Sequence, residues 1–594
     1  MTRFRHEALL ARTFFFRFFE NDVLPAGIAP ARLVFSGLVA LAVPMYLLTF
    51  VFLMKYEQLH AFRPARLPIT MFLDELVFVT VSMIGLGAVA LLSWDGVFPD
   101  RRDARTFGVL PLSTRAIVTG KLAALGALAL LFAVGPNLLA GVLYGTILWM
   151  YGGAANPIRG IAAHVIAPAG AGLFVFFTLI AIQGVLLAVL GRRLAQRLTL
   201  LFQTLFVVLL LQTLLFLPYL RAVAGRAFGP PPTGDARWLP PAWFLSLYDA
   251  IAGTDRAVSA GDVLVAAGAT AAAMLSAVLL IALSYRRLAR QALETPDLGP
   301  RRWRRLRSGA GRAAGALTRH PVARGVAAFT LQTLRRSRTH LVLLSTYGGV
   351  AAAIVISTLI PVLATVGATS TFAAPGLTLL SIPLVFNFLL IAGARVLFGI
   401  PTELGANWLF RLHVSDHDAP RAVAGAQVAL LTGIALGIAV LTATAGALLW
   451  DVRTGAIHGA FTLLAGWLLA ELLVVDFRSV PFTRIYTPGH WRVKGLWPLY
   501  VLAFTAYAWW LAALAAAALV RPSLLLLFAG IVVFVAIAAR LRRRRAFRAA
   551  PGLTFVGEEV DAMFAGFGLS ESIAADARRT MFPRARSGKP PAES

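Results

Sequence analysis

The chain has 594 residues, of which 59% are hydrophobic and only 14% are charged, and its formal net charge is +28. Soluble domains are typically about 45–50% apolar and about 25% charged, so this composition excludes an ordinary soluble protein and indicates an integral membrane protein. The sequence contains no cysteine, which excludes disulfide bonds, thiolate catalysis, iron–sulfur clusters and cysteine-ligated zinc.

The first element expected along the chain is an amphipathic helix near the N-terminus. The stretch RFRHEALLARTFFFRFFE places phenylalanine and alanine side chains along one face and Arg5 and Arg12 elsewhere. This pattern is typical of a helix that lies in the membrane interface. Residues 323–340, ARGVAAFTLQTLRRSRTH, predict a second helix of the same kind.

Twelve apolar runs are long enough to cross the ~30 Å core of a bilayer as helices, which takes about 20 residues each. The runs are continuous rather than alternating, and lipid offers backbone groups no hydrogen-bond partner, so helices are the expected spanning elements. The predicted fold class is an all-α polytopic membrane protein with two repeated six-helix halves. The expected spans are 31–54, 75–94, 122–148, 162–190, 197–219, 262–284, 341–364, 376–399, 424–450, 457–477, 496–519 and 521–540.

Arginine is concentrated between the sixth and seventh spans and, as RLRRRRAFR, after the twelfth. Because Lys and Arg flank spans on the cytoplasmic side, we expect both termini and the linker 286–340 in the cytoplasm. These arginines adjoin membrane ends and lack interleaved aromatic residues, so we expect contact with anionic membrane lipids and no nucleic-acid partner.

The loop between the second and third spans ends in GVLPLSTRAIVTGK, residues 108–121. The segment 100–110 can form three helical turns, which Pro111 ends, and Ser113 or Thr114 can cap the helix of the third span. The pattern predicts a short helix across the membrane end. The alternative is a simple turn whose arginines anchor the loop at the lipid headgroups.

The same region recurs in the second half of the chain. Arg115-Ala116-Ile117 and Arg421-Ala422-Val423 stand at equivalent positions, at the starts of the third and ninth spans. A global repeat of this kind is typical of internally duplicated transporters. The predicted division is a first permease half at 1–285, a basic linker with an interfacial helix at 286–340, a second half at 341–540 and a cytoplasmic tail at 541–594.

In this order of elements the chain resembles the transmembrane subunit of ABC-2 type exporters. The carrying features are the interfacial helix, the helix that ends in LPLSTRAIVTGK, and an outer segment, WLPPAWFLSLYDAIAG at 238–253, before the sixth span. The chain then resembles two permease halves fused together. The second half departs from the pattern, because it lacks the Leu-Pro turn and only VRP separates its last two spans.

The resemblance implies export of an unidentified hydrophobic or amphipathic substrate, powered by ATP. The sequence has no G-x-x-x-x-G-K-[ST] motif, so we expect no enzyme activity or cofactor in this chain, and ATP and Mg²⁺ in a cytoplasmic ABC ATPase subunit present in two copies. The expected location is a bacterial inner (cell) membrane. In the family the helix between spans two and three rests in a cleft of the ATPase, which nominates as coupling residues Asp100, Arg101, Arg102, Asp103, Arg105, Pro111, Trp408, Phe410 and Arg411.

Two further constellations bear on function. HVSDH, residues 413–417, could place two imidazoles on one helix face as in a metal-dependent, membrane-embedded hydrolase, but Asp418 and Pro420 favour a solvated turn, and we expect no metal or catalytic residues. Arg395 and Glu471 lie at similar depth in spans eight and ten and are predicted to neutralise each other.

A proton- or ion-coupled secondary transporter is the main alternative function. Such a carrier usually needs buried carboxylates along its path, and the apparent scarcity of charges within the spans counts against it.

Overall fold

The computed structural model describes residues 2–18, 30–99, 103, 106–107, 110–216, 238–254, 256, 260–294, 318–402, 407–483, 493–549 and 552–553. Within these ranges the regular secondary structure is helical throughout. Twelve helical stretches in them are long and apolar enough to cross a membrane. The twelve expected spans and the all-α polytopic fold class are thereby confirmed.

The spanning helices form two sets in chain order. The first set is α2 (Pro30–Phe62), α3 (Leu67–Leu92), α6 (Thr114–Met150), α7 (Pro157–Leu215) and α10 (Ala260–Glu294). The second set is α13 (Arg338–Val366), α15 (Leu377–Leu397), the run of α17 (Ala419–Leu430), η6 (Leu431–Ala435) and α18 (Leu436–Leu449), then α19 (Val452–Val474), the run of α20 (Val493–Thr505), η7 (Ala506–Trp510) and α21 (Leu511–Val520), and α22 (Ser523–Ala549).

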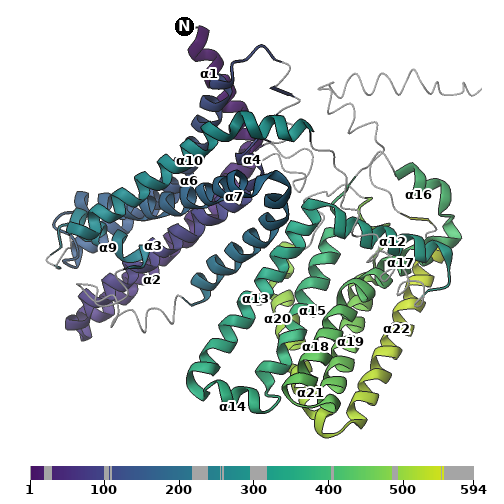
Figure 1. The fold of residues 1–594 in the computed structure, drawn as a ribbon. Helices are drawn as coiled ribbons and strands as arrows, with labels where there is room; N and C mark the ends of the chain where they lie inside the picture. The colour runs from purple at the N-terminus through teal and green to yellow at the C-terminus, as the bar shows by residue number, and fades with distance from the viewer. Residues whose placement is uncertain are drawn as a thin grey trace, which may run out of the picture.

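Shorter helices lie at the two ends of these sets, as Figure 1 shows. One end, which we call the basic end, carries α1 (Thr2–Arg17), α4 (Trp94–Val97), α12 (Pro321–Arg336) and α16 (Asn407–His413). The opposite end, which we call the α9 end, carries α9 (Pro240–Ala252) and α14 (Ala368–Ala373). The two amphipathic helices expected from the sequence therefore exist as α1 and α12.

Helix α7 contains two spans although its backbone is helical without a break. Contacts of Gly87 on α3 show that α7 makes two passes: a Cβ placed at Gly87 would lie 2.9 Å from Leu210 and 3.3 Å from Val175, both on α7. On a straight helix the roughly 35 residues between those two would separate them by about 50 Å. The helix therefore turns back between them, and the fourth and fifth spans cross separately, as predicted.

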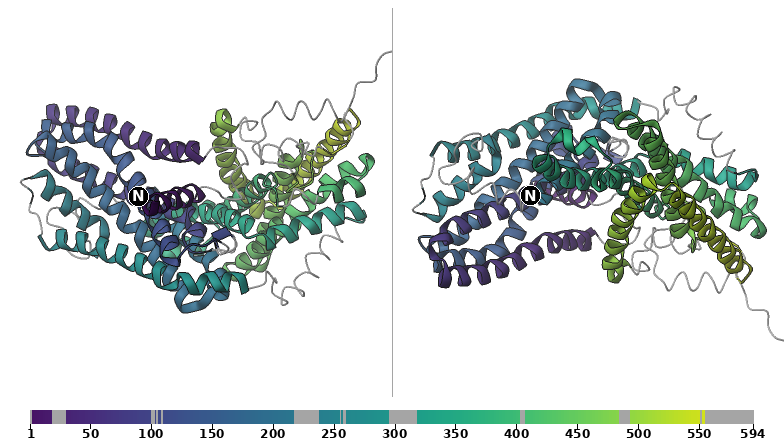
Figure 2. Two further views of the ribbon diagram at one scale, coloured as in Figure 1. Left: turned by 90° about the horizontal axis from the view of Figure 1, so that it is seen from above. Right: turned by 90° about the horizontal axis from the view of Figure 1, so that it is seen from below.

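The fifth span also joins the two halves, which stand side by side as separate bundles in both views of Figure 2. Gln212 on α7 donates a hydrogen bond of 3.0 Å to the hydroxyl of Ser357 on α13. A Cβ at Gly349 on α13 would lie 3.4 Å from Val207 of α7. The second part of α7 thus packs on the first spanning helix of the second half.

The turn between the third and fourth spans is built alike in both halves. Helix α7 is capped by Asn156, whose side chain accepts from the Arg159 N–H at 2.9 Å, and α19 by Asp451, which accepts from the Thr454 N–H at 3.0 Å. Beside each cap two helices approach so closely that only glycine fits. A Cβ at Gly145 would lie 2.3 Å from the α7 backbone, and small residues of this kind are the usual contact of membrane helices.

Candidate functional site

A buried ion-pair junction ties the loop before α6 to two helices at the basic end. Asp103 is only 4% exposed, and its carboxylate lies 2.8 Å from the Lys121 ammonium on α6 and 2.7 Å from the Arg17 guanidinium at the end of α1. The rings of Phe14 and Phe107 pack beside it with centroids 4.7 Å apart. One carboxylate between two cations, inside an aromatic shell, holds these three segments together.

Ser113 begins α6 immediately after this junction. Its hydroxyl accepts a hydrogen bond of 3.2 Å from the Ala116 N–H, which is the N-cap arrangement. Of the two residues that the sequence offered as the cap, the structure selects Ser113, because Thr114 is already the first helical residue. Pro111 precedes the cap and is exposed.

The coupling residues nominated from the sequence fall into three groups. Asp103 is buried and pairs with Lys121 and Arg17, so the contacts that the structure gives it are within this chain, and its coupling role stays a prediction. Those outside the described residues, whose docking role stays a prediction, are Asp100, Arg101, Arg102 and Arg105, and the side chains of Trp408 and Arg411. Pro111 and Phe410 are described.

In the second half Phe410 of α16 packs inward. Its ring centroid lies 5.0 Å from that of Phe329 on α12, beside the buried side chains of Val326, Ala422 and Val480. α16 is thus attached to α12, which in turn lies along α17. The second half has its own connection between a basic-end segment and its third span, made by apolar contact instead of an ion pair.

Glu471 on α19 is completely buried and meets cations of α22. Its carboxylate lies 3.5 Å from the guanidinium of Arg543, which is 3% exposed, and 3.7 Å from that of Arg540. The Trp467 indole N–H donates to it at 3.1 Å, and Arg543 also donates to Gln427 on α17 at 3.4 Å. The group links three helices.

Arg395 on α15 has other contacts near the same depth. Its Nε donates to the carbonyl of Leu473 at 2.9 Å, and its guanidinium lies 4.4 Å from the centroid of the Phe477 ring. Arg540 and Arg543 are the ion-pair partners that the structure gives Glu471. The predicted neutralisation of Glu471 by Arg395 stays a prediction.

The HVSDH stretch forms the end of α16 and a following turn. His413 lies in hydrogen-bond contact with the Leu409 carbonyl at 2.9 Å, while His417 is 81% exposed beside the ion pair of Asp418 with Arg421. Within the described ranges no group of three or more His, Asp and Glu side chains is placed to hold a metal ion. The arrangement is that of a solvated turn.

A polar assembly of nine described side chains lies at the opposite, α9 end of the first half, and the sequence patterns did not predict it. We call it the α9-end network; its members are Lys55, Tyr56, Asp74, Glu75, Tyr144, His164, Tyr248, Asp249 and Arg256. They come from α2, α3, α6, α7, α9 and the segment after α9. The network therefore joins five helices and the segment after α9 at this end of the bundle.

One part of the network is centred on Arg256. Its two terminal nitrogens each donate to one oxygen of Glu75 at 2.8 Å, and one of them also lies 3.2 Å from Asp249. Glu75 is completely buried and Asp249 is 4% exposed. The Thr254 hydroxyl donates to Asp249 at 3.3 Å. Two parallel bonds to a carboxylate are the strongest arrangement open to arginine.

A second part is centred on Asp74. Its carboxylate accepts from the ammonium of Lys55 and, at 2.9 Å, from the hydroxyl of Tyr56. The Tyr56 hydroxyl is 2.7 Å from that of Tyr144 on α6. Asp74 and Glu75 are consecutive, so their side chains project about 100° apart around α3. Asp74 therefore contacts α2, whereas Glu75 contacts Arg256 in the segment after α9.

His164 on α7 lies between these parts and is completely buried. Its Nδ1 is 3.2 Å from the Tyr248 hydroxyl on α9, and its ring packs against Phe78 and Tyr144 with centroids 4.5 Å and 5.0 Å away. Its Nε2 is buried without a hydrogen-bond partner in the described part of the chain.

Helix α9 corresponds to the outer segment predicted at 238–253 and is fixed at its end by two devices. Gly253 follows it with φ +68°, a left-handed conformation that favours glycine. The guanidinium of Arg159 donates to the carbonyls of Ile251 at 2.8 Å and Ala250 at 3.0 Å. The last turn of α9 is thereby held on the start of α7, with Asp249 facing Arg256.

Burial and, after it, the negative charge of Glu75 raise the pKa of Asp249 from 3.8 to about 7, although Arg256 and the hydroxyl of Thr254 act in the opposite direction. The Arg256 cation, 3.2 Å from Asp249, does not cancel this rise in pKa, because its two shorter hydrogen bonds go to Glu75.

The signal for this network was present but was interpreted wrongly. The expected second span, 75–94, leaves Asp74 outside it and Glu75 at its first position, whereas α3 begins at Leu67. An Asp-Glu pair seven residues inside a continuous apolar helix would have identified a buried charged site. The scarcity of carboxylates within spans, which counted against a proton-coupled carrier, is therefore corrected.

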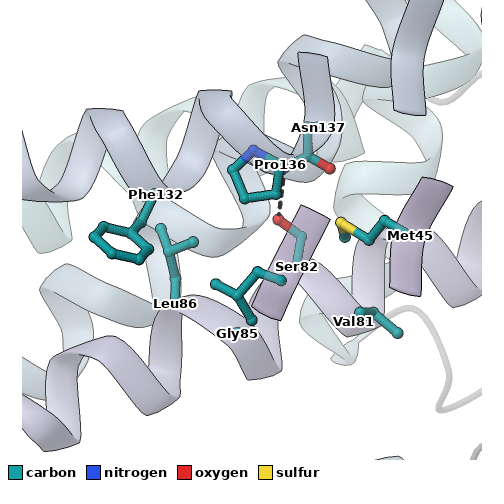
Figure 3. A pocket seen from close by; sticks show the side chains of 9 residues that line it. Met45, Val81, Ser82, Gly85, Leu86, Phe132, Pro136 and Asn137 are labelled. Atoms are coloured by element: carbon teal, nitrogen blue, oxygen red, sulfur yellow. Dashed lines mark hydrogen bonds between the residues drawn. The ribbon is translucent and has the colours of Figure 1, made fainter. Parts of the chain in front are cut away.

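A small notch lies between α2, α3 and α6, nearer the middle of the helices (Figure 3). Asn137 reaches from α6 to the Ser82 hydroxyl on α3 at 3.1 Å, next to Pro136. Its side-chain oxygen is buried without a hydrogen-bond partner in the described residues. The walls are apolar: Leu41, Met45, Val81, Leu86 and Phe132. The notch therefore combines an apolar lining with one hydrogen-bond acceptor, the side-chain oxygen of Asn137, that has no partner among the described residues.

Comparison with protein-family models, with curated proteins and with solved structures finds no match to this chain. The class that the fold defines is an all-helical multi-pass membrane protein with buried ion networks at both ends.

Proposed function

We propose that this chain is the membrane-spanning permease of an ABC-2 type exporter, which moves a hydrophobic or amphipathic substrate with energy from a separate ATPase bound at the basic end. The observation that carries the proposal is the Asp103 junction with Lys121 and Arg17. A loop that must pass movement from a soluble subunit to a span has to be rigidly attached to that span. Here a buried carboxylate attaches the loop to α6 and to α1.

The second half supports the same reading with different residues. Phe410 rests on Phe329 of α12, and α12 packs along α17, the start of the third span of that half. Each half therefore couples a basic-end segment to its own third span, and the two attachments differ in chemistry. An ATPase pair would meet two unequal contacts.

The test reverses the charge of two arginines in the loop before α6. Arg101→Glu with Arg102→Glu should leave abundance intact but weaken co-purification of a Walker-motif ATPase and lower its substrate-stimulated rate, because like charges at a complementary contact cost affinity. Arg453→Glu with Arg521→Glu is the matched control, since both arginines are exposed at the opposite end. Unchanged binding and stimulation, or no ATPase partner at all, would overturn the proposal.

For orientation we propose a bacterial inner membrane, with both termini and the linker 286–340 in the cytoplasm. The support is the arginine content of the linker. Because the chain lacks cysteine, single cysteines at Ser308 and at Ser370, which is exposed on α14, can be labelled from either side. An impermeant thiol reagent added outside should label the cysteine at position 370 and not the one at position 308. Equal labelling of both would contradict the proposed topology.

A second candidate function, a proton-coupled transporter, is favoured by one observation. Asp74 and Glu75 are completely buried within α3, and Asp249 is buried beside them. Buried carboxylates of this kind mark proton relays in pumps and carriers. Transport by the chain alone in vesicles, driven by a pH gradient without ATP, would select this function over the exporter.

A further inference from the structure

Among the residues that the structure describes, the α9-end network holds more carboxylates than cations. Its three carboxylates are Asp74, Glu75 and Asp249, and its two cations are Lys55 and Arg256. All three carboxylates are at most 4% exposed. With every acid ionised the network would carry one unbalanced negative charge away from water, which is costly.

The hydrogen-bond geometry shows which of the three carboxylates has the weakest contacts with cations and donors. Glu75 receives two bonds of 2.8 Å from Arg256, and Asp74 receives Lys55 and the Tyr56 hydroxyl. From the described part of the chain, Asp249 receives only the third, 3.2 Å contact of the Arg256 guanidinium, which is already bound to Glu75, and a 3.3 Å contact from the Thr254 hydroxyl. Asp249 is therefore the acid whose charge the protein supports least.

We propose that Asp249 is a proton-binding site: its carboxylate takes one proton from water at the α9 end, while Glu75 and Asp74 stay ionised. The proton bonds to a carboxylate oxygen and the network becomes neutral. The inference holds whether an ATPase or a gradient powers the chain.

The other titratable and charged groups around Asp249 act in the same direction or are already engaged. Arg159 of α7 binds backbone carbonyls at the end of α9, and His164 of α7 lies in hydrogen-bond contact with Tyr248. α10, which packs on α9, contributes Asp262 at its first turn, a further buried acid. The other titratable or charged side chains of the network are Lys55 and Tyr56 of α2, Asp74 and Glu75 of α3, Tyr144 of α6 and Arg256.

Proton uptake has a structural consequence at α9. The ionised Asp249 attracts the Arg256 guanidinium, which also binds Glu75 of α3, and so ties α9 to α3 through Arg256; protonation of Asp249 removes this charge attraction and weakens the tie. Burial also raises the pKa of Asp249 to about 7, so both forms are populated near neutral pH. The seating of α9 on α3 and α7 then responds to pH on its own side of the membrane.

The experiment is an infrared titration of the full chain in lipid nanodiscs, from about pH 5 to about pH 9, which follows the carbonyl stretch of protonated carboxyl groups. The wild-type protein should show one such band that disappears as the pH rises through about 7. Asp249→Asn should lack this band. Glu75→Gln should move its midpoint to lower pH, because a neighbouring negative charge is removed and Arg256 is released to Asp249.

Asp451→Asn is the matched control, because Asp451 is an exposed aspartate that caps α19, and the band should be unchanged in it. No band that titrates in this range, or a band that survives Asp249→Asn, would overturn the proposal. If Asp249→Asn does not fold, the Glu75→Gln titration decides alone, and an unmoved midpoint rejects the site. None of these measurements involves an ATPase, so they are independent of the exporter proposal.

Discussion

Glu75 on α3 and Arg256, which lies 181 residues further along the chain, form two parallel hydrogen bonds of 2.8 Å each. The carboxylate is completely buried, and the side chain of the arginine is 13% exposed. This pair fixes the segment between α9 and α10 onto the second span. Helix α9 is thus part of the bundle rather than a loose connection.

The first prediction concerns that pair. Arg256→Gln should destabilise the protein by about 3–5 kcal/mol, because it leaves the buried Glu75 carboxylate uncompensated. The double variant Glu75→Gln with Arg256→Gln should be less damaged than the sum of the single variants. Thermal and denaturant unfolding in detergent measures both effects.

Arg338→Gln is the control for this prediction, because Arg338 pairs with Asp95 at the surface, with both side chains more than 40% exposed. Its loss should cost about 0–1 kcal/mol. Additive effects of the Glu75 and Arg256 substitutions would show that the two side chains do not depend on each other.

The second prediction concerns the junction at the basic end. Asp103→Asn should speed amide hydrogen exchange in the loop and the first turn of α6 by roughly tenfold to a hundredfold, because charged hydrogen bonds contribute about 1.5–3 kcal/mol. Lys121→Met should do less, since Asp103 keeps Arg17 as a partner. Equal exchange in wild type and Asp103→Asn would mean that the junction does not hold the loop.

The third prediction compares two possible partners of Glu471. A double-mutant cycle of Glu471→Gln with Arg543→Gln should give a coupling of about 0.5–3 kcal/mol, as expected for contacting charges. The cycle with Arg395→Gln should give a smaller coupling, because Arg395 already donates to the Leu473 carbonyl. A larger coupling for Arg395 would restore the pairing predicted from the sequence.

The fourth prediction is a pH dependence of stability. Burial raises the pKa of Asp249 from 3.8 to about 7, so between these values the folded protein binds a proton that the unfolded chain releases. Stability should therefore fall as the pH rises from about 4 to about 7, by at most about 4 kcal/mol at 1.36 kcal/mol per pKa unit. Asp249→Asn should remove this slope, and an identical slope in that variant would assign it to another group.

Local patterns in the sequence predicted a large part of the fold. Continuous apolar runs gave the twelve spans, and the Leu-Pro turn with its hydroxyls predicted a capped start for the third span, which Ser113 provides. The amphipathic stretches that became α1 and α12 followed from the side-chain period alone. These features depend on residues within a few turns of each other, and the lipid solvent leaves the backbone no alternative to a helix.

Only the tertiary structure shows which charged side chains are buried and which side chains they pair with. Asp103 was nominated as a docking residue and is buried between Lys121 and Arg17. Asp74 and Glu75 lie at or before the first residue of the expected span 75–94, but the structure places both inside α3. Their partners lie up to 181 residues away in the chain. A sequence shows that a charge stands in an apolar stretch, but the cost of burying it depends on which distant side chain meets it, and only the packed helices determine that.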